Sequence, residues 1–445
     1  MWEITLPVLF GGLLLWIAFM RHRQRLRDWQ EAAVTCGLQV MEVAEWGQQL
    51  TVGKGPLEVK IEPCGNKGQS TRIIVSVPGS TDFYSVSIRR EPLLRRAREI
   101  EIGESSFDST FLLEGPAPQV LALLDAEMRS LLIEVNTECQ LEISAGALRA
   151  EDMSDEQVPY VLPLLLDIGR RLTQTTNVPQ RLAENAHRDP EDGVRLRNLL
   201  ALIGEHSRDP RTIEALRTAC SDPSPEIRLR AAKELGAEGR GVLLDLAESL
   251  VDDAVSAEAV SILDRALPFE RTTAILDHAL DRQYNQTTRV CLEALGKSGD
   301  TAAVDALAQV MTREQGEPAA AAAQALGTTE SPAAEPPLID ALQREQADLR
   351  VAAATALGLL GSVAAVLPLK EAAERFWLDL ELRRATRQAI AGIQSRLGGA
   401  SPGQLSLAET ETGQLSLAPF EAGQLSLAQD EPPPREREKP PVRRA

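Results

Sequence analysis

Between residues 178 and 397 the chain repeats itself, and this repeat constrains the fold more than any other feature. The two clearest copies are residues 227–236 (IRLRAAKELG) and 349–358 (LRVAAATALG). Both consist of an apolar residue, an arginine, paired alanines and a final Leu-Gly. Weaker copies end at residues 203, 264, 296, 327 and 391, so successive copies lie 28 to 33 residues apart. The spacing predicts about seven units.

Each unit is expected to be a pair of antiparallel helices, because an amphipathic segment precedes the later copies. These segments are residues 212–220, 242–250, 274–281, 303–311, 337–343 and 366–374. The Asp-Pro pairs at 189–190, 209–210 and 222–223 suit helix starts. The glycine after the repeat leucine suits a left-handed helix end. Paired alanines allow neighbouring helices to approach closely. Since no pair buries its apolar face alone, the pairs are expected to stack into an α-solenoid over residues 178–397.

This pattern resembles the HEAT-repeat family, in particular the short bacterial repeats similar to those of phycobilin lyases. The resemblance covers about half of the chain. It implies a helical solenoid that serves as a binding surface, but a fold alone does not fix a role.

Some HEAT-like proteins, the deoxyhypusine hydroxylases, bind iron through His-Glu pairs, and this chain lacks such pairs. Its four histidines are His22, His187, His206 and His278, and none is followed by glutamate. No two of them lie within one helical turn, as a metal site on a helix would need. No cysteine or aromatic cluster marks a chromophore pocket. The sequence therefore predicts no catalysis, no cofactor and no metal. A HEAT-like enzyme or cofactor-handling protein of the phycobilin lyase or deoxyhypusine hydroxylase kind is the alternative.

The N-terminal segment predicts a membrane anchor. Residues 4–20 form a nearly unbroken apolar run of 17 residues, close to the shortest length that spans a bilayer. Four arginines that could contact anionic lipids follow it: Arg21, Arg23, Arg25 and Arg27. Basic flanks stay in the cytoplasm, so we expect a single-pass protein of the inner or plasma membrane. Its N-terminus would lie outside and its body in the cytoplasm. A cleaved secretory signal is the rival interpretation, but it requires a basic leader and a small-residue cleavage site.

Between the anchor and the solenoid, the sequence predicts a juxtamembrane helix at 21–36 and a small α+β domain at 37–175. In this domain, Leu57-Glu-Val-Lys-Ile-Glu62 alternates apolar and polar residues as a half-buried strand does. The expected strands are residues 38–43, 57–62, 71–77, 85–89, 100–102, 107–114 and 139–143. Helices are expected at 118–134 and 158–172.

Composition excludes some partners. The formal net charge of −18 argues against nucleic acid as the main ligand. Aromatic residues make up only 4% of the chain, which is typical of helices packed through small residues. No motif for a small-molecule substrate is evident. The five cysteines are scattered and odd in number, which favours reduced thiols in the cytosol.

The C-terminal tail, residues 398–445, is polar and is expected to be disordered by itself. It carries the hexapeptide GQLSLA three times, at 403–408, 413–418 and 423–428. One interpretation is a linear protein-binding motif used several times over. The other is a low-complexity duplication without a ligand. If the copies are protein-binding motifs, their anchors would be the paired leucines of each copy: Leu405, Leu407, Leu415, Leu417, Leu425 and Leu427.

Taken together, these patterns predict a mainly α protein with one transmembrane helix, a small α+β domain, a solenoid of about seven helix pairs and a tail. The function expected of it is a membrane-anchored scaffold or adaptor for protein–protein interaction on the cytosolic face. The sequence does not identify the protein partners.

Overall fold

The computed structural model describes residues 2–43, 49–65, 69–77, 84–90, 100–174, 177–396, 405–406 and 416–417. For residues 2–15, 17–19 and the last two pairs, the description covers the backbone only. The chain divides into two compact units, Met1–Val255 and Ser256–Ala445. The division falls inside a helix of the solenoid rather than between the sheet and the first repeat.

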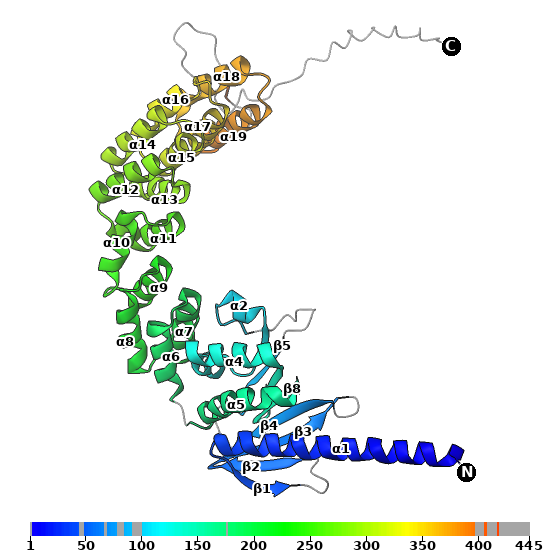
Figure 1. Ribbon diagram of the computed structural model, residues 1–445. Coiled ribbons are helices and arrows are strands. Elements are labelled where there is room, and N and C mark those ends of the chain that lie inside the picture. The colour runs from blue at the N-terminus through cyan, green and yellow to red at the C-terminus, as the bar shows by residue number, and fades with distance from the viewer. Residues whose placement is uncertain are drawn as a thin grey trace, which may run out of the picture. The chain divides into compact units, whose positions relative to one another are not determined.

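Unit 1 contains a β-sheet and the first helices of the solenoid (Figure 1). Its strands are β1 (Gln39–Val43), β2 (Leu50–Lys54), β3 (Leu57–Cys64), β4 (Ser70–Ser76), β5 (Ser87–Arg90), β6 (Phe111–Glu114), β7 (Gln140–Ser144) and β8 (Ala147–Met153). Its helices are α1 (Trp2–Thr35), α2 (Ser105–Asp108), α3 (Ala117–Leu123), α4 (Ala126–Glu138), α5 (Val158–Thr173), α6 (Val178–Arg188), α7 (Asp192–Glu205), α8 (Pro210–Ala219), α9 (Pro225–Leu235) and α10 (Arg240–Ser249).

Helix α11 (Asp253–Leu263) contains the division, and the later helices belong to unit 2. They are α12 (Phe269–Arg282), α13 (Asn285–Ser298), α14 (Thr301–Arg313), α15 (Glu317–Thr328), α16 (Glu335–Ala341), α17 (Ala347–Leu360), α18 (Val366–Arg375) and α19 (Leu380–Arg396). Two short strands follow, β9 (Leu405–Ser406) and β10 (Ser416–Leu417).

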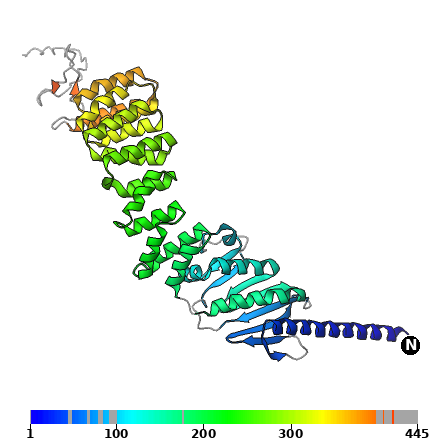
Figure 2. The ribbon, with the colours of Figure 1, turned by 60° about the vertical axis from the view of Figure 1, so that its left-hand side comes forward.

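The eight strands of unit 1 form one antiparallel sheet in the order β1-β2-β3-β4-β8-β7-β5-β6. In β3, the buried residues Leu57, Val59 and Ile61 alternate with the half-buried Glu58 and Lys60. One face of the sheet is therefore apolar and the other polar. Helices α1 and α5 lie side by side across the sheet (Figures 1 and 2). The core of unit 1 thus lies between the sheet and its helices.

Most of the strands expected in the α+β domain are present, with local differences. Residues 50–54 and 147–153 form strands that the sequence did not predict, and residues 100–102 form none. The expected strand 107–114 begins as the short helix α2 and becomes extended only at Phe111. The expected helix 118–134 is two helices, because the chain breaks at Leu124 and Asp125 caps α4 by accepting a hydrogen bond from the Met128 N–H.

One continuous helix, α1, covers both the predicted anchor and the predicted juxtamembrane helix. Its C-terminal half packs against the sheet, where Trp29, Ala32 and Ala33 are buried. Its N-terminal half projects beyond the sheet (Figure 1). In the part of the chain that is described, no helix has a segment long and apolar enough to cross a bilayer. The side chains of residues 4–15 and 17–19 of the apolar run lie outside the described ones.

The solenoid consists of the seven helix pairs that the repeat predicted, from α6–α7 to α18–α19. At the repeat leucine, Leu295, Leu326 and Leu357 are buried as expected, whereas Leu235 is only half-buried. Asp209 caps α8 as expected, with Pro210 in the first helical position. The other two Asp-Pro pairs, at 189–190 and 222–223, lie in the turns before α7 and α9 and do not begin those helices.

The glycine after the repeat leucine ends its helix only at Gly236, which has a positive φ of 58°. Gly296, Gly327 and Gly358 lie inside their helices, so the prediction that they form left-handed helix ends is wrong. They allow close packing instead. A Cβ on Gly327 would lie 2.8 Å from the Ala356 Cβ in the next pair, and one on Gly358 would lie 3.0 Å from the Ala389 Cα. Contacts between glycine and alanine therefore allow these successive helix pairs to lie close together.

The first helix pair shares a hydrophobic core with the sheet. Leu182, Val194 and Leu202 belong to the same buried cluster as the sheet residues. The Asn185 side-chain amide donates a hydrogen bond to the carbonyl of Leu121 in α3 at 3.0 Å. The sheet domain and the first repeat are therefore one packed body within unit 1.

Little of the tail belongs to the described residues. Strands β9 and β10 lie in the first two GQLSLA copies and pair antiparallel, with Leu417 opposite Leu405 and Ser416 opposite Ser406. The remaining residues from 397 onward lie outside the described part, so the prediction of a disordered tail stays a prediction.

Candidate functional site

Buried ion pairs join successive helix pairs of the solenoid. The Arg195 guanidinium donates to both oxygens of Asp222, in the next pair, at 2.8 and 2.9 Å. It also donates to the carbonyls of Asp189 and Pro190 in its own turn. The hydrogen bonds to Asp222 raise the pKa of Arg195, although burial opposes this. This arginine is the one in the repeat motif, and it links two successive helix pairs.

An arginine–aspartate pair of the same kind occurs at both ends of the solenoid. Arg350 donates to Asp379 at 3.1 Å and to the carbonyls of Arg344 and Glu345. At the other end Arg129, on α4 of the sheet domain, donates to Asp189 at 2.8 and 2.9 Å. Thus α4 supplies the arginine that a preceding repeat would supply. The three arginines thus donate to a carboxylate and to backbone carbonyls, although the buried Nε of Arg350 has no hydrogen-bond partner. These contacts hold neighbouring elements together.

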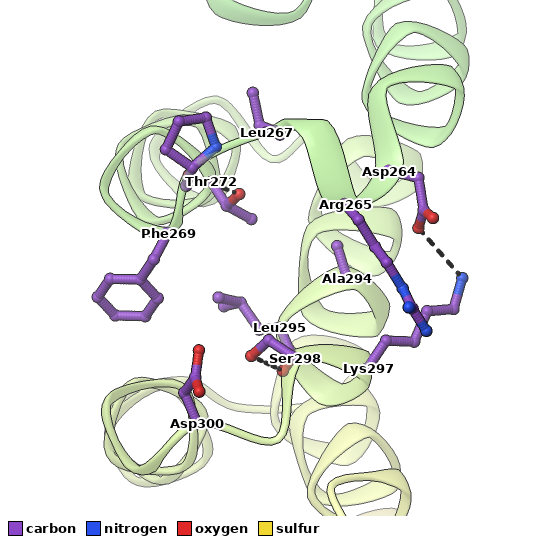
Figure 3. Close-up of a pocket in the computed structure, with 11 residues that line it drawn as sticks. Asp264, Arg265, Leu267, Phe269, Thr272, Ala294, Leu295, Lys297, Ser298 and Asp300 are labelled. Carbon is purple, nitrogen blue, oxygen red and sulfur yellow. Dashed lines mark hydrogen bonds and ion pairs between the residues drawn. The ribbon is translucent and has the colours of Figure 1, made fainter.

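A recess lies in unit 2, between the end of α11, α12 and α13 (Figure 3). Its volume is about 460 Å³. Figure 3 shows Asp264, Arg265 and Lys297 on one side of it, and Phe269 and Asp300 on the other. Lys297 Nζ lies 3.9 Å from an Asp264 carboxylate oxygen. The lining residues are Asp264, Arg265, Leu267, Pro268, Phe269, Thr272, Ala294, Leu295, Lys297, Ser298 and Asp300.

The charged residues of this recess are open to solvent. Asp264, Arg265, Lys297 and Asp300 are all exposed to solvent. Charges of both signs lie beside an aromatic ring, so the recess offers polar and apolar contacts to a peptide segment. It also lies where the helix pairs depart most from the motif, since the copy ending at 264 is only 28 residues after the one ending at 236. We call it the α12 recess.

The histidines and cysteines form no reactive cluster in the described residues. His187 and His278 are exposed and His206 is half-buried. No group of three or more potential metal ligands is present among the residues that the structure places. All five cysteines are free thiols. Burial raises the pKa of Cys291 to about 12, and burial followed by the charge of Glu138 raises that of Cys139 to about 12. Both thiols are therefore protonated near neutral pH.

The four arginines proposed for lipid contact have different surroundings. Arg25 donates to the Asp155 carboxylate at 2.6 Å, and the same carboxylate accepts hydrogen bonds from the Trp29 indole and the Thr71 hydroxyl. Arg25 therefore attaches α1 to the sheet domain. Arg21, Arg23 and Arg27 are exposed.

The structure also shows a surface that the sequence did not indicate. Trp377, Leu378 and Leu380 lie in and beside the turn between α18 and α19, with exposed fractions of 63%, 74% and 73%. We call these three residues the terminal patch. Beneath it, the Arg350 guanidinium stacks on the Phe376 ring, with its carbon 3.8 Å from the ring centroid. The only sequence signal was the apolar run Phe376-Trp-Leu-Asp-Leu380 at a position where turns are usually polar.

Of the six tail leucines proposed as anchors, only two lie among the described residues. Leu405 and Leu417 face each other in the β9–β10 ladder. The other four, Leu407, Leu415, Leu425 and Leu427, lie outside the described part.

Comparison with known proteins identifies the repeats. The family model for HEAT repeats matches residues 179–255 and 315–391. Human deoxyhypusine hydroxylase in complex with glycerol is similar at 19% identity and a TM-score of 0.22, covering 49% of this chain and 96% of that one. An engineered protein is similar at 19% identity and a TM-score of 0.28, covering 41% of this chain and 96% of that one. At these TM-scores neither likeness bears on function. No curated protein matches the chain. The family match agrees with the repeat motif, the buried leucines and the helix pairs, so residues 179–255 and 315–391 are HEAT repeats.

Proposed function

We propose that the chain is a membrane-anchored scaffold that binds other proteins on the cytosolic face of the inner or plasma membrane, without catalysis. The observation that carries this proposal is the solenoid of seven helix pairs, which contains HEAT repeats and carries the α12 recess on its surface. Stacked repeats of this kind create extended surfaces suited to protein partners.

Two surfaces are offered for partners. The α12 recess combines charges of both signs with the Phe269 ring. The paired leucines of the GQLSLA copies would act as additional docking motifs, since three copies on one tail raise the effective concentration of each. The partners themselves are proteins whose identity the chain does not indicate.

The anchor in this proposal is the N-terminal half of α1. It carries the apolar run, and it projects beyond the sheet while the second half is packed (Figure 1). Exposed Arg21, Arg23 and Arg27 follow the run, on the side that the proposal places in the cytosol. Arg25 has a structural partner in Asp155 and contributes less to lipid contact.

The anchor is tested by fractionation and topology in a bacterial host. The full chain should stay with membranes after a carbonate wash, and a C-terminal alkaline phosphatase fusion should be inactive while a C-terminal fluorescent fusion is bright. Replacing Leu13, Leu14 and Leu15 by arginine should release the chain into the soluble fraction. A wild-type chain that washes off, or an active phosphatase fusion, contradicts the proposed location.

The scaffold role is tested by capture from the native membrane with two charge-reversed forms. Arg265→Glu with Lys297→Glu changes the α12 recess, and Arg208→Glu with Arg211→Glu changes exposed arginines elsewhere on the solenoid. A specific partner should be lost with the first form and retained with the second. Equal recovery with both would exclude the recess as the binding surface. Stoichiometric metal or chromophore in the purified chain would instead favour the enzyme or cofactor-handling alternative.

A further inference from the structure

We propose that the terminal patch is a docking site for the chain's own tail, and that leucines of the GQLSLA copies occupy it in the same molecule. This inference goes beyond the scaffold role and does not depend on the membrane anchor. It makes the tail a ligand of the solenoid as well as a candidate ligand of other proteins.

The terminal patch has the chemistry of a binding site. Leu378 and Leu380 are the two most exposed large apolar side chains among the described residues, and Trp377 is close behind. Tryptophan is enriched at the centres of protein interfaces because it buries a large area with little loss of side-chain entropy. Three such residues within four positions of one turn are costly to leave in water. An occupant is therefore expected.

The surroundings of the terminal patch carry more basic than acidic groups, since Asp379 is paired with Arg350 and Glu381 is the one exposed acid in the first turn of α19. Helix α19 buries Leu382, Ala385, Ala389 and Ile393. Its other side displays three arginines that are exposed to solvent, Arg383, Arg384 and Arg387. In a chain of net charge −18, this places an apolar turn next to a cationic helix face. The occupant that fits best is an acidic segment with spaced apolar residues.

The tail has the complementary chemistry. Residues 401–431 contain no lysine or arginine. They contain five acidic residues, Glu409, Glu411, Glu421, Asp430 and Glu431. The acidic residues lie in the spacers after each copy, so leucines on the terminal patch would be accompanied by carboxylates near the arginines of α19. Opposite charges at the rim of an apolar contact favour encounter and orientation.

The tail also reaches the terminal patch. Arg396 ends α19, and its guanidinium donates to the carbonyls of Gly358 and Gly361, which fixes the point where the tail begins. Along α19, Leu380 lies about 24 Å from this point, at 1.5 Å per residue. The nine residues from Arg396 to Leu405 span about 30 Å when extended. The first copy therefore reaches the terminal patch, and the second and third copies reach it with slack.

The backbone of the copies suits such a contact. The described residues of the first two copies, β9 and β10, are extended and paired, with Leu417 opposite Leu405. In an extended strand, Leu405 and Leu407 are two residues apart and lie on one side. Because the tail is tethered, its effective concentration at the terminal patch is on the order of millimolar. The same molecule therefore has an advantage over a second copy or an outside protein, which must displace the tail.

Hydrogen–deuterium exchange of the full-length chain tests this proposal. We expect slowed exchange of backbone amides in residues 403–428 of the wild type. The protection should be lost in two forms: one with all six tail leucines replaced by alanine, and one with Trp377→Ala, Leu378→Ala and Leu380→Ala. A control with the exposed apolar residues Ile213→Ala and Val251→Ala should keep it. Since the substituted solenoid positions are all exposed, the melting temperature of the patch form and of the control should stay unchanged.

Each outcome decides the matter. Tail protection that depends on the terminal patch and is unchanged on tenfold dilution supports the proposal. A wild-type tail that exchanges freely, or one whose protection survives the loss of the terminal patch, overturns it. Protection that is lost on dilution, together with a larger mass by light scattering at high concentration, overturns it in favour of a second copy. A further form with Arg383→Glu, Arg384→Glu and Arg387→Glu should weaken the protection. Unchanged protection would contradict the proposed attraction between the acidic tail and the arginines of α19.

Discussion

The two units of this chain hold their helix pairs together in different ways. In unit 1, buried ion pairs link neighbours: Arg129 with Asp189, and Arg195 with Asp222. In unit 2, successive pairs meet at Gly296, Gly327 and Gly358, where an added Cβ would lie within 3.0 Å of atoms of the next pair. An ion pair of the first kind also links its last two helix pairs, through Arg350 and Asp379.

This difference has consequences for what each unit tolerates. A buried ion pair is sensitive to the loss of either partner, since the remaining charge lacks compensation. A glycine–alanine contact contains no charge and is sensitive only to added volume. We therefore expect unit 1 to be weakened most by deletion of charged groups, and unit 2 by changes of size at the glycines and leucines.

The largest effect is expected for Arg129→Ala. It removes the link between α4 and the first turn of the solenoid and leaves Asp189, which is 1% exposed, without its partner. The expected loss is about 3–5 kcal/mol in the free energy of unfolding of unit 1. Urea unfolding followed by circular dichroism measures it. Arg217→Ala breaks an exposed, solvent-screened pair with Glu238 and should change the stability far less. Equal effects of the two substitutions would contradict the role of the buried pair.

Leu357→Ala is expected to affect unit 2 by a similar or smaller amount. Leu357 is fully buried in α17, between the neighbouring helices. Removing it should cost about 2–5 kcal/mol, from lost burial and the cavity left behind. Thermal unfolding of the full chain measures the shift, with Gln388→Ala on the exposed side of α19 as the control. If the melting temperature is the same in both, the repeat leucine is not the core residue that the motif indicates.

A smaller effect is expected for Gly327→Ala. The added methyl group would lie 2.8 Å from the Ala356 Cβ, so the two helices must move apart. Overpacking of this kind costs about 1–3 kcal/mol. At Gly204 in α7, an added Cβ meets nothing within 4 Å. Gly204→Ala should therefore stabilise the chain by about 0.4–1 kcal/mol. Destabilisation by both substitutions would mean that the glycines have no special packing role.

The smallest effect concerns the thiols. Cys291 in unit 2 is buried and has a pKa of about 12, whereas Cys36 and Cys220 in unit 1 are half-buried. Thiol labelling at pH 8, read by mass spectrometry, should modify Cys36 and Cys220 before Cys291. Since burial raises the folded pKa of Cys291 above about 8.5, the unfolded value, its contribution to stability should fall as the pH rises from about 8.5 to 12. Labelling of Cys291 first would show that unit 2 opens more readily than its packing implies.

Much of the solenoid was predictable because its signals are local. The 31-residue spacing and the apolar positions defined all seven helix pairs, and Leu295, Leu326 and Leu357 are buried as the motif requires. The role of the glycines was not predictable in this way. Gly236 does end its helix, but the same Leu-Gly signal at Gly327 continues as helix, because the decisive contact is with Ala356 in the next pair.

The sheet domain was less predictable, since its strands are stabilised by pairing rather than by their own sequence. Residues 50–54 contain Gly53, and residues 147–153 contain charged side chains on the polar face. The sequence pattern therefore predicted neither segment as a strand. For the ion pairs, the repeat motif gave the arginine. Its aspartate lies 27 to 29 residues later, in the next turn, as in Arg195–Asp222 and Arg350–Asp379. Arg129 lies outside the repeat, and only the tertiary structure shows that it takes the same role.

The sheet and the first repeats form one unit, and its boundary with the second unit lies inside α11. Native-state hydrogen exchange of the full chain at increasing urea concentrations tests this most directly. We expect slow amides of β3, α5 and α7 to open together, at one urea concentration, and those of α13, α15 and α17 to open together at another. Arg129→Ala should lower the urea concentration at which the first group opens and leave that of the second group unchanged. If α7 instead opens together with α15, while β3 and α5 open separately, the sheet and the solenoid are independent and the claim is wrong.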